Sequence, residues 1–160
     1  MSQIDQMLQG LAASAGLSDA IQFNQQGVAT LSVAGKLELH LEKVNDGRAL
    51  QLYCVIGPLP SVQRETLLLD AMQANLFAAQ TKGSVLSIDA QSNELLLSQL
   101  VHPEAVSNQQ FLELLDDFID VAEIWRDKLA AKRWLLPEAS SAAPKAAEHE
   151  LIQTQFMHRV

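Results

Sequence analysis

The chain begins with helical periodicity and changes to strand periodicity after about residue 20. Ser2, with Asp5 three residues later, predicts the start of an amphipathic helix, and Gly16 predicts its end. The apolar positions of this helix recur at helical spacing: Ile4, Met7, Leu8, Leu11, Ala12 and Ala15. Apolar and polar positions then alternate, which predicts strands near residues 21–24, 28–33, 36–42 and 50–56. Asn45-Asp46-Gly47 is typical of a tight hairpin turn.

The second predicted helix is apolar on almost every side. Ser61 is a candidate N-terminal cap, and the apolar run extends from Leu67 to Ala79. A helix that covers one face of a sheet needs only one apolar stripe. The apolar side chains on its other sides must therefore be buried against something other than the sheet. In a chain this small the favoured cover is a second copy of the chain, and the alternative is the third helix of the same molecule.

The second half of the chain predicts a hairpin followed by a long helix. The hairpin strands are near residues 85–88 and 95–101, with a turn at 90–93. Ser107 with Gln110 predicts a capping box at the start of the long helix. Its apolar stripe steps by four and three residues, and acidic residues occupy most of the opposite side. The stripe consists of Phe111, Leu115, Phe118, Ala122, Trp125 and Leu129.

The composition changes after about residue 131. Residues 138–147 have the Ala- and Ser-rich composition of a linker, and an apolar cluster follows at Leu151, Ile152, Phe156, Met157 and Val160. We therefore expect one domain over residues 1–131 and a flexible or partly helical C-terminal tail over residues 132–160. Residues 20–33 can form one strand region or two. Counted as one, they give the element order α-β-β-β-α-β-β-α, which predicts an α+β fold in which helices flank a twisted, mainly antiparallel sheet, in a homodimer.

Charge and cysteine content narrow the classes of partner. The net charge is −8 and the isoelectric point is about 4.8. Nucleic acids and anionic membranes attract clustered Lys and Arg, so neither is an expected partner, whereas a protein with basic segments is. The single cysteine, Cys54, excludes an internal disulfide framework and favours a reducing cytosol. The polar N-terminus lacks the features of a signal peptide, and no apolar run approaches the roughly 18 residues of a transmembrane helix.

No group of residues in the sequence predicts catalysis or metal binding. His40 falls on the polar side of a strand and is interpreted as a solvated surface residue. Cys54 falls inside an apolar strand, where burial hides a thiol. The acidic side of the long helix is interpreted as solvated surface, with a docking surface for a basic partner as the alternative. The sequence contains no glycine-rich phosphate loop. We expect no enzyme activity, cofactor or metal; a small hydrolase or metalloenzyme is the least favoured alternative.

Three segments resemble the class I type III secretion chaperones, the Tir-chaperone or CesT-like family. They are residues 67–77, 83–89 and 111–126, and the resemblance covers about residues 3–130. It implies a small, acidic, cytoplasmic bacterial protein that forms a homodimer. Such a protein binds a secreted effector near the effector's N-terminus and keeps that segment soluble and export-competent without using ATP. The effector segment adds strands to sheet edges and places apolar side chains in surface grooves.

The resemblance also implies two sets of site residues. The dimer interface lies on the second helix, at Leu68, Leu69, Met72, Leu76 and Phe77. The partner-binding grooves lie on the first helix and the neighbouring strands, at Leu8, Leu11, Ile21, Phe23, Leu31 and Val33. Core packing is the alternative role for each groove residue. The chain also resembles the ExsC-type regulatory branch, in its length, in its ending Met157-His158-Arg159-Val160 and in the patterned stretch Phe111–Leu129. That branch binds a small secreted regulator and, in competition with it, an anti-activator of transcription.

Overall fold

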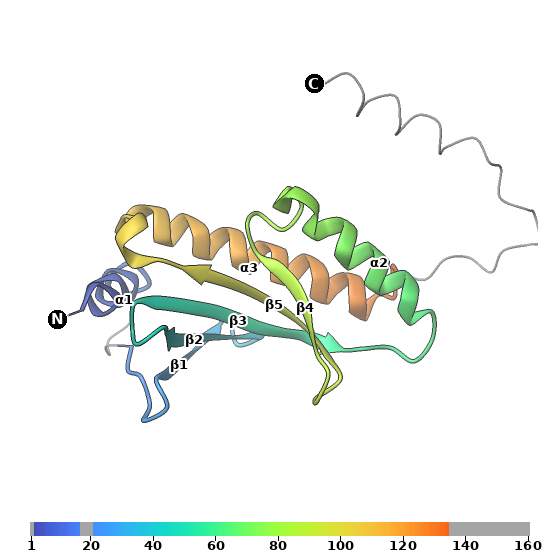
Figure 1. Ribbon diagram of the computed structural model, residues 1–160, viewed down its shortest axis with the longest axis horizontal. Helices are drawn as coiled ribbons and strands as arrows, with labels where there is room; N and C mark the ends of the chain where they lie inside the picture. The colour runs from blue at the N-terminus through green and yellow to red at the C-terminus, as the bar shows by residue number, and fades with distance from the viewer. Residues whose placement is uncertain (1, 17–20, 135–160) are drawn as a thin grey trace, which may run out of the picture.

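The computed structural model describes residues 2–16 and 21–134, and Figure 1 shows how their elements are arranged. The order of elements confirms the predicted α+β fold, with two short 3₁₀ turns, η1 and η2, in addition. The bounds are α1 Gln3–Ser14, β1 Val28–Val33, β2 Leu37–Val44, β3 Ala49–Pro58, α2 Arg64–Asn75, η1 Leu76–Ala78, β4 Val85–Asp89, β5 Glu94–Val101, η2 Pro103–Ala105 and α3 Asn108–Ala130. The linker-like segment and the apolar cluster predicted after it lie outside the described residues.

The five strands form one antiparallel sheet in the order β1-β2-β3-β5-β4. Strands β1 and β4 are therefore its two edges. The turn between β2 and β3 has positive φ at Asn45 and Asp46, as the sequence predicted for a tight hairpin. The register of β3 against β5 shifts between Val55 and Gly57. A Cβ atom on Gly57 would lie 2.7 Å from Cδ2 of Leu129, so the absence of a side chain lets α3 approach the strand closely.

Helices α2 and α3 lie on one side of the sheet, and α1 packs near the N-terminal part of α3 (Figure 1). The alternation in β2 follows from this arrangement, because Leu37, Leu39 and Leu41 are buried while Glu38 is exposed. The stripe predicted on the long helix is confirmed over most of its length. Its buried members are Phe111, Leu115, Phe118, Ala122 and Trp125.

The local signals at the helix starts are also confirmed. Ser2 Oγ accepts from the amide of Asp5 at 3.2 Å, and the Asp5 carboxylate accepts from the amide of Ser2 at 3.0 Å. Ser107 and Gln110 make the same reciprocal pair at the start of α3. These capping boxes satisfy amide groups that the first turn of a helix leaves without a partner.

The predicted strand at residues 21–24 is wrong. The side-chain oxygen of Asn24 accepts hydrogen bonds from the amides of Gln26 and Val28, at 2.9 and 3.0 Å. This local turn competes with strand pairing and folds the segment back onto the start of β1. Ile21 and Phe23 still pack against the core, so their alternation arises from burial on one side rather than from a strand.

The second helix is shorter than predicted at both ends. Ser61 does not cap it, because the residue before the first helical turn is Gln63, in a left-handed conformation with φ 48°. The helix ends at Asn75, whose side-chain amide makes two 2.9 Å hydrogen bonds with the main chain of Leu86 in β4. Phe77 then has a φ of 57°, outside the helical region. A contact with the sheet edge thus ends a helix that the apolar pattern would have continued.

Candidate protein-binding surfaces

A hollow of about 420 Å³ lies between α1, β1 and α3, and we call it the α1–β1 groove. Three of the predicted partner-binding residues, Leu11, Leu31 and Val33, line it together. All three are half-buried, so each leaves apolar surface open to a bound segment. The rest of the lining is Ala15, Thr30, Ser32, Leu39, Leu112, Leu115, Asp116 and Ile119.

A smaller hollow of about 180 Å³ on α1 contains two further predicted residues, Leu8 and Ile21. Leu8 is only 3% exposed, so most of its side chain belongs to the core. Phe23 lines neither of these hollows; the Nζ atom of Lys43 lies over its ring, 4.2 Å from the centroid. The predicted set therefore comprises groove residues, a core residue and a ring packed under a cation.

An ion pair joins α1 to β2 beside these hollows. Lys43 Nζ lies 3.1 Å from Asp5 Oδ1. Hydrogen bonds from Ser2, and after them the one from Lys43, lower the pKa of Asp5 to about 2. The pair helps to position the helix that carries Leu11. Sequence analysis missed it, because Lys43 is 38 residues from its partner and no local pattern connects the two.

The outer edge of β1 offers main-chain groups next to the groove. Both main-chain groups of Val28 point away from β2, because they bond Asn24. The two-residue period of a strand then places the amide and carbonyl groups of Thr30 and Ser32 on the same outer side. Among residues 21–134, no element pairs with β1 on this side. The edge can therefore accept an added strand.

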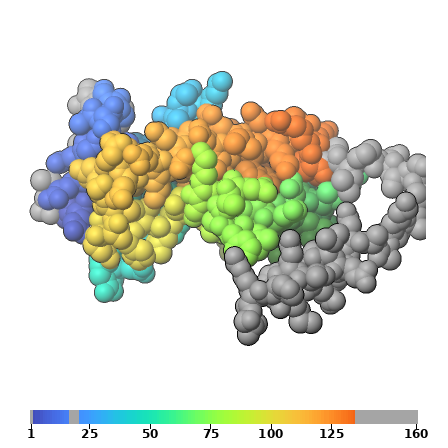
Figure 2. Space-filling model, turned by 90° about the horizontal axis from the view of Figure 1, so that it is seen from above, coloured from blue at the N-terminus to red at the C-terminus, as the bar shows by residue number. Residues whose placement is uncertain are grey.

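A second apolar surface, which we call the α2 face, lies on the outer side of α2 and η1. It consists of Leu69, Met72, Leu76 and Phe77, which are 67, 71, 59 and 88% exposed. The remaining predicted interface residue, Leu68, is half-buried against the core. Figure 2 shows α2 at the surface beside the second half of α3, with no described element over it in this view. The third helix therefore does not cover the surplus apolar side chains within the described part of the molecule.

Two sets of ion pairs hold this part of the chain against α3. Lys128 of α3 pairs with Asp70 of α2. Lys82, which precedes β4, lies 2.7 Å from Asp117 and 3.2 Å from Asp120, and these two carboxylates raise its pKa. The pairs favour the orientation in which Leu67, Ala71 and Ala74 are buried and the α2 face points outward. Two aspartates of the acidic side of α3 therefore have a structural partner.

The described residues contain no group of three or more His, Cys, Asp or Glu side chains able to hold a metal ion. Cys54 is buried, and burial raises the pKa of its thiol to about 12. His40 is less solvated than expected: its ring stacks on Tyr53 with centroids 4.9 Å apart, and its Nδ1 lies 3.0 Å from Thr30 Oγ1. No helix in the described part is long and apolar enough to cross a membrane.

The sequence model of the Tir chaperone protein (CesT) family matches residues 6–126, and the chain belongs to this family. A Chlamydia pneumoniae protein is 21% identical over 127 residues, which are 79% of this chain and 95% of that protein.

Two solved structures resemble the fold. The HopA1–SchA chaperone–effector complex contains a chain with a TM-score of 0.65 and 18% identity, covering 78% of this chain and 94% of that one. The ExsC–ExsE complex contains a chain with a TM-score of 0.65 and 17% identity, and the match covers 86% of this chain and 96% of that one. At these identities the likeness concerns the fold alone. The match of the family model is what confirms the chaperone family that the sequence segments resemble.

Proposed function

We propose that this protein is a cytoplasmic bacterial type III secretion chaperone. In this role a homodimer binds the N-terminal segment of a secreted effector, or of a small secreted regulator, and keeps it soluble and competent for export. Membership of the Tir chaperone family supports the general role. The fold shared with chains from chaperone–effector and ExsC–ExsE complexes supports the kind of partner.

The observation that carries the proposal is the position of the α1–β1 groove beside the open edge of β1. An extended client segment on this edge would exchange main-chain hydrogen bonds with Thr30 and Ser32. Its alternate side chains would point to one face, where Leu11, Leu31 and Val33 leave apolar surface exposed. Strand addition gives affinity for many sequences, and the groove adds a preference for apolar side chains at alternate positions.

The α2 face supports the homodimer. Four large apolar side chains exposed next to one another are rare on the surface of a protein that functions as a monomer. A two-fold axis through this face would bring each of them against the same set in a second copy. The dimer would then present two grooves to one client chain, which raises the overall affinity without any new type of contact.

This function requires binding alone. It is consistent with a protein that acts without catalysis, cofactor or metal, and that has no nucleic acid or membrane among its partners. Export competence follows if the bound segment cannot collapse into its own core while its apolar side chains occupy the grooves.

The test is a pull-down of the tagged chain from its host, with mass spectrometry of the intact complex. We expect two copies of this chain with one secreted protein. Leu11→Glu should reduce the amount of captured client, because it places a charge in the groove. Ala13→Glu is the matched control, since Ala13 is exposed on the same helix. A capture that is equal for both variants would contradict the groove assignment, and a chain recovered without any partner would contradict the function.

A second candidate function is the sequestration of an anti-activator of type III secretion genes. The observation in its favour is the likeness to a chain of the ExsC–ExsE complex, which covers a larger share of this chain than the HopA1–SchA likeness does. The same pull-down separates the two functions. A small secreted regulator exchanging with an anti-activator would support this branch, and a large effector would support the first.

A further inference from the structure

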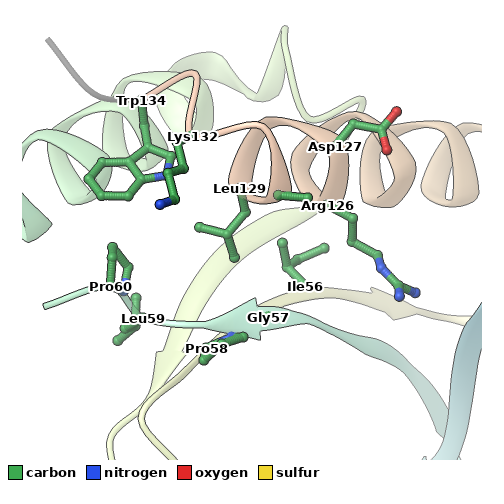
Figure 3. Close-up of a pocket in the computed structure, with 11 residues that line it drawn as sticks. Ile56, Gly57, Pro58, Leu59, Pro60, Arg126, Asp127, Leu129, Lys132 and Trp134 are labelled. Carbon is green, nitrogen blue, oxygen red and sulfur yellow. The ribbon is translucent and has the colours of Figure 1, made fainter. Parts of the chain in front are cut away.

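A third hollow, distinct from both binding surfaces, lies at the end of α3, where the described chain stops. It has a volume of about 500 Å³ and lies between the C-terminal turns of α3 and the segment that joins β3 to α2. Figure 3 shows Leu129 projecting towards β3, and Trp134 above Pro60 at one side of the hollow. We call it the α3-end pocket. Its lining includes Ile56, Leu59, Pro60, Leu129 and Trp134.

The end of α3 explains how Trp134 reaches this position. Lys132 has a left-handed φ of 53°, and its amide bonds the carbonyl of Leu129 at 3.2 Å. The amide of Arg133 bonds the carbonyl of Lys128 at 3.0 Å. These two bonds form a Schellman motif, which ends a helix and reverses the chain. The reversal directs Trp134 back over the pocket and not along the axis of α3.

Trp134 leaves one polar group without a partner. The side chain is 6% exposed, and its indole Nε1 is buried without a hydrogen-bond acceptor. A buried donor that is not hydrogen-bonded destabilises the folded state, because it has lost its hydrogen bonds to water and gained none in return. An acceptor at this point would remove that cost. An apolar pocket with one unsatisfied donor matches an apolar peptide segment that presents a main-chain carbonyl.

We propose that the α3-end pocket binds this chain's own C-terminal segment, residues 148–160. The pocket lies where the chain leaves the described body, and 16 residues separate Trp134 from Leu151. An extended chain of that length reaches about 50 Å, so the connection imposes no restriction. Covalent attachment also supplies an effective concentration on the order of millimolar, which an independent partner would have to match.

The sequence of the segment fits the pocket in pattern and in charge. Ile152, Phe156 and Val160 are spaced by four residues, which gives one apolar stripe if the segment is helical. The acidic residues Glu148 and Glu150 precede the stripe, and the pocket lining has two cations, Arg126 and Lys132, against one carboxylate, Asp127. The linker-like composition of residues 138–147 agrees with a tether between the pocket and a docked segment.

The experiment follows the indole N–H resonance of Trp134 in the full-length, client-free protein. The spectrum contains two indole signals, from Trp125 and Trp134, and Trp134→Phe assigns them. We expect Phe156→Asp to shift the Trp134 signal by several line widths, because the docked segment is released. Gln155→Asp, which adds the same charge at the neighbouring position, should leave the signal in place. An unchanged signal in Phe156→Asp would overturn the proposal.

A substitution in the pocket tests whether this pocket is the docking site. Ala130 lines the pocket and is exposed, so Ala130→Glu fills space without disturbing the core. In the Ala130→Glu background, Phe156→Asp should cause no further shift, since the segment is already displaced. A second shift of full size would place the segment elsewhere and overturn the assignment to this pocket.

A spin label at position 157 distinguishes the chain's own segment from that of a second copy. The label is attached through Met157→Cys; Cys54 is buried, so it does not compete for the reagent. We expect the Trp134 signal to lose most of its intensity in the uniformly labelled protein. In a second sample, isotope-labelled wild-type chains are mixed with spin-labelled chains that carry no isotope. There the Trp134 signal of the wild-type chains should keep its intensity. Loss of the signal in the mixed sample would show that the partner copy's segment occupies the pocket, and would overturn the proposal. Because no client is present, these results are independent of the proposed chaperone function.

Discussion

The α2 face and the α1–β1 groove are both apolar and both exposed, but they differ in shape and in main-chain chemistry. The α2 face consists of side chains that project from a helix whose backbone groups are already hydrogen-bonded within it. The groove is recessed between two helices and a strand, and the main-chain groups on the strand edge beside it are not paired by any described strand. One surface offers side chains alone, and the other offers side chains together with an extended template.

This difference explains why the two surfaces suit different partners. Projecting side chains pack well only against a surface whose gaps match them. A second copy of the same helix, related by a two-fold axis, offers such a surface. A strand edge recognises any extended backbone, and the recessed groove then selects apolar side chains at alternate positions. We therefore expect substitutions to separate dimer formation from client binding. Leu76→Asp and Ser32→Pro test this separation, while Gly57→Ala and Asp5→Asn test the packing beneath the surfaces and the anchor of α1.

The largest effect is expected for Leu76→Asp, which should dissociate the dimer. The charge would be buried in an apolar interface twice, once for each copy, at a cost of several kcal/mol. Leu76 is exposed in the single chain, so the fold should persist. Light scattering should report the mass of one chain, and circular dichroism an unchanged spectrum. Gln109→Asp, at an exposed position in the first turn of α3, adds the same charge away from the α2 face and should remain dimeric. A dimer that survives Leu76→Asp would show that the α2 face is not the interface.

Gly57→Ala should destabilise the body beneath both surfaces without changing either. The new methyl group would overlap Cδ2 of Leu129, which is the end of a half-buried side chain that can shift, so we expect the low end of the usual overpacking cost, about 1 kcal/mol. Urea unfolding at fixed protein concentration should show a lower midpoint. Leu129→Ala in the same chain should recover part of the loss, because it removes the atom that the methyl group meets. If the stability losses of Gly57→Ala and Leu129→Ala simply add in the double variant, the steric explanation is contradicted.

Ser32→Pro should weaken client binding and leave the dimer intact. Proline removes an amide hydrogen that points away from β2, and an edge strand tolerates such a substitution. The loss of one main-chain hydrogen bond is worth about 1 kcal/mol, or roughly a fivefold change in Kd. Ser32→Thr keeps the amide and is the matched control. Equal client affinity for both variants, measured by calorimetry, would exclude strand addition at this edge.

The smallest effect is expected for Asp5→Asn, which loosens the anchor of α1. The folded state lowers the pKa of Asp5 from 3.8 to about 2, so this carboxylate stabilises the fold above pH 4. The contribution is lost as the pH falls from about 4 to about 2. Because the Asp5 side chain is 40% exposed, we expect only about 0.5–1 kcal/mol at pH 7. The stability difference between wild type and variant should shrink at pH 3. A difference that is the same at both pH values would contradict this account.

The accuracy of the sequence predictions depended on how far apart the interacting residues are. Ser2 with Asp5 and Ser107 with Gln110 were predicted correctly, because a capping box lies within four consecutive residues. The end of α2 was predicted incorrectly, because it depends on a contact between Asn75 and Leu86, on another element. Residues 21–24 show a third case, in which alternation produced by burial has the same pattern as a strand.

The candidate surfaces show the same limit. The resemblance to the chaperone family named residues for both surfaces, and the apolar pattern alone could not separate their roles. Leu8 and Leu11 lie one turn apart on α1, yet Leu8 is in the core and Leu11 lines the groove. Their roles differ because the neighbouring elements cover Leu8 almost completely and leave Leu11 partly exposed, and the spacing of apolar residues does not contain that information.

The sequence by itself therefore determined the order of the main elements, the starts of α1 and α3, the hairpin turn and the buried stripe of α3. Each of these follows from hydrogen bonds or periodicity within a few residues. Only the tertiary structure decided that Leu11 lines one groove with Leu31 and Val33, that no other described element covers the α2 face within one chain, and that Trp134 folds back over a pocket. These features depend on contacts between residues far apart in the chain, and such contacts exist only once the sheet and its helices have packed together.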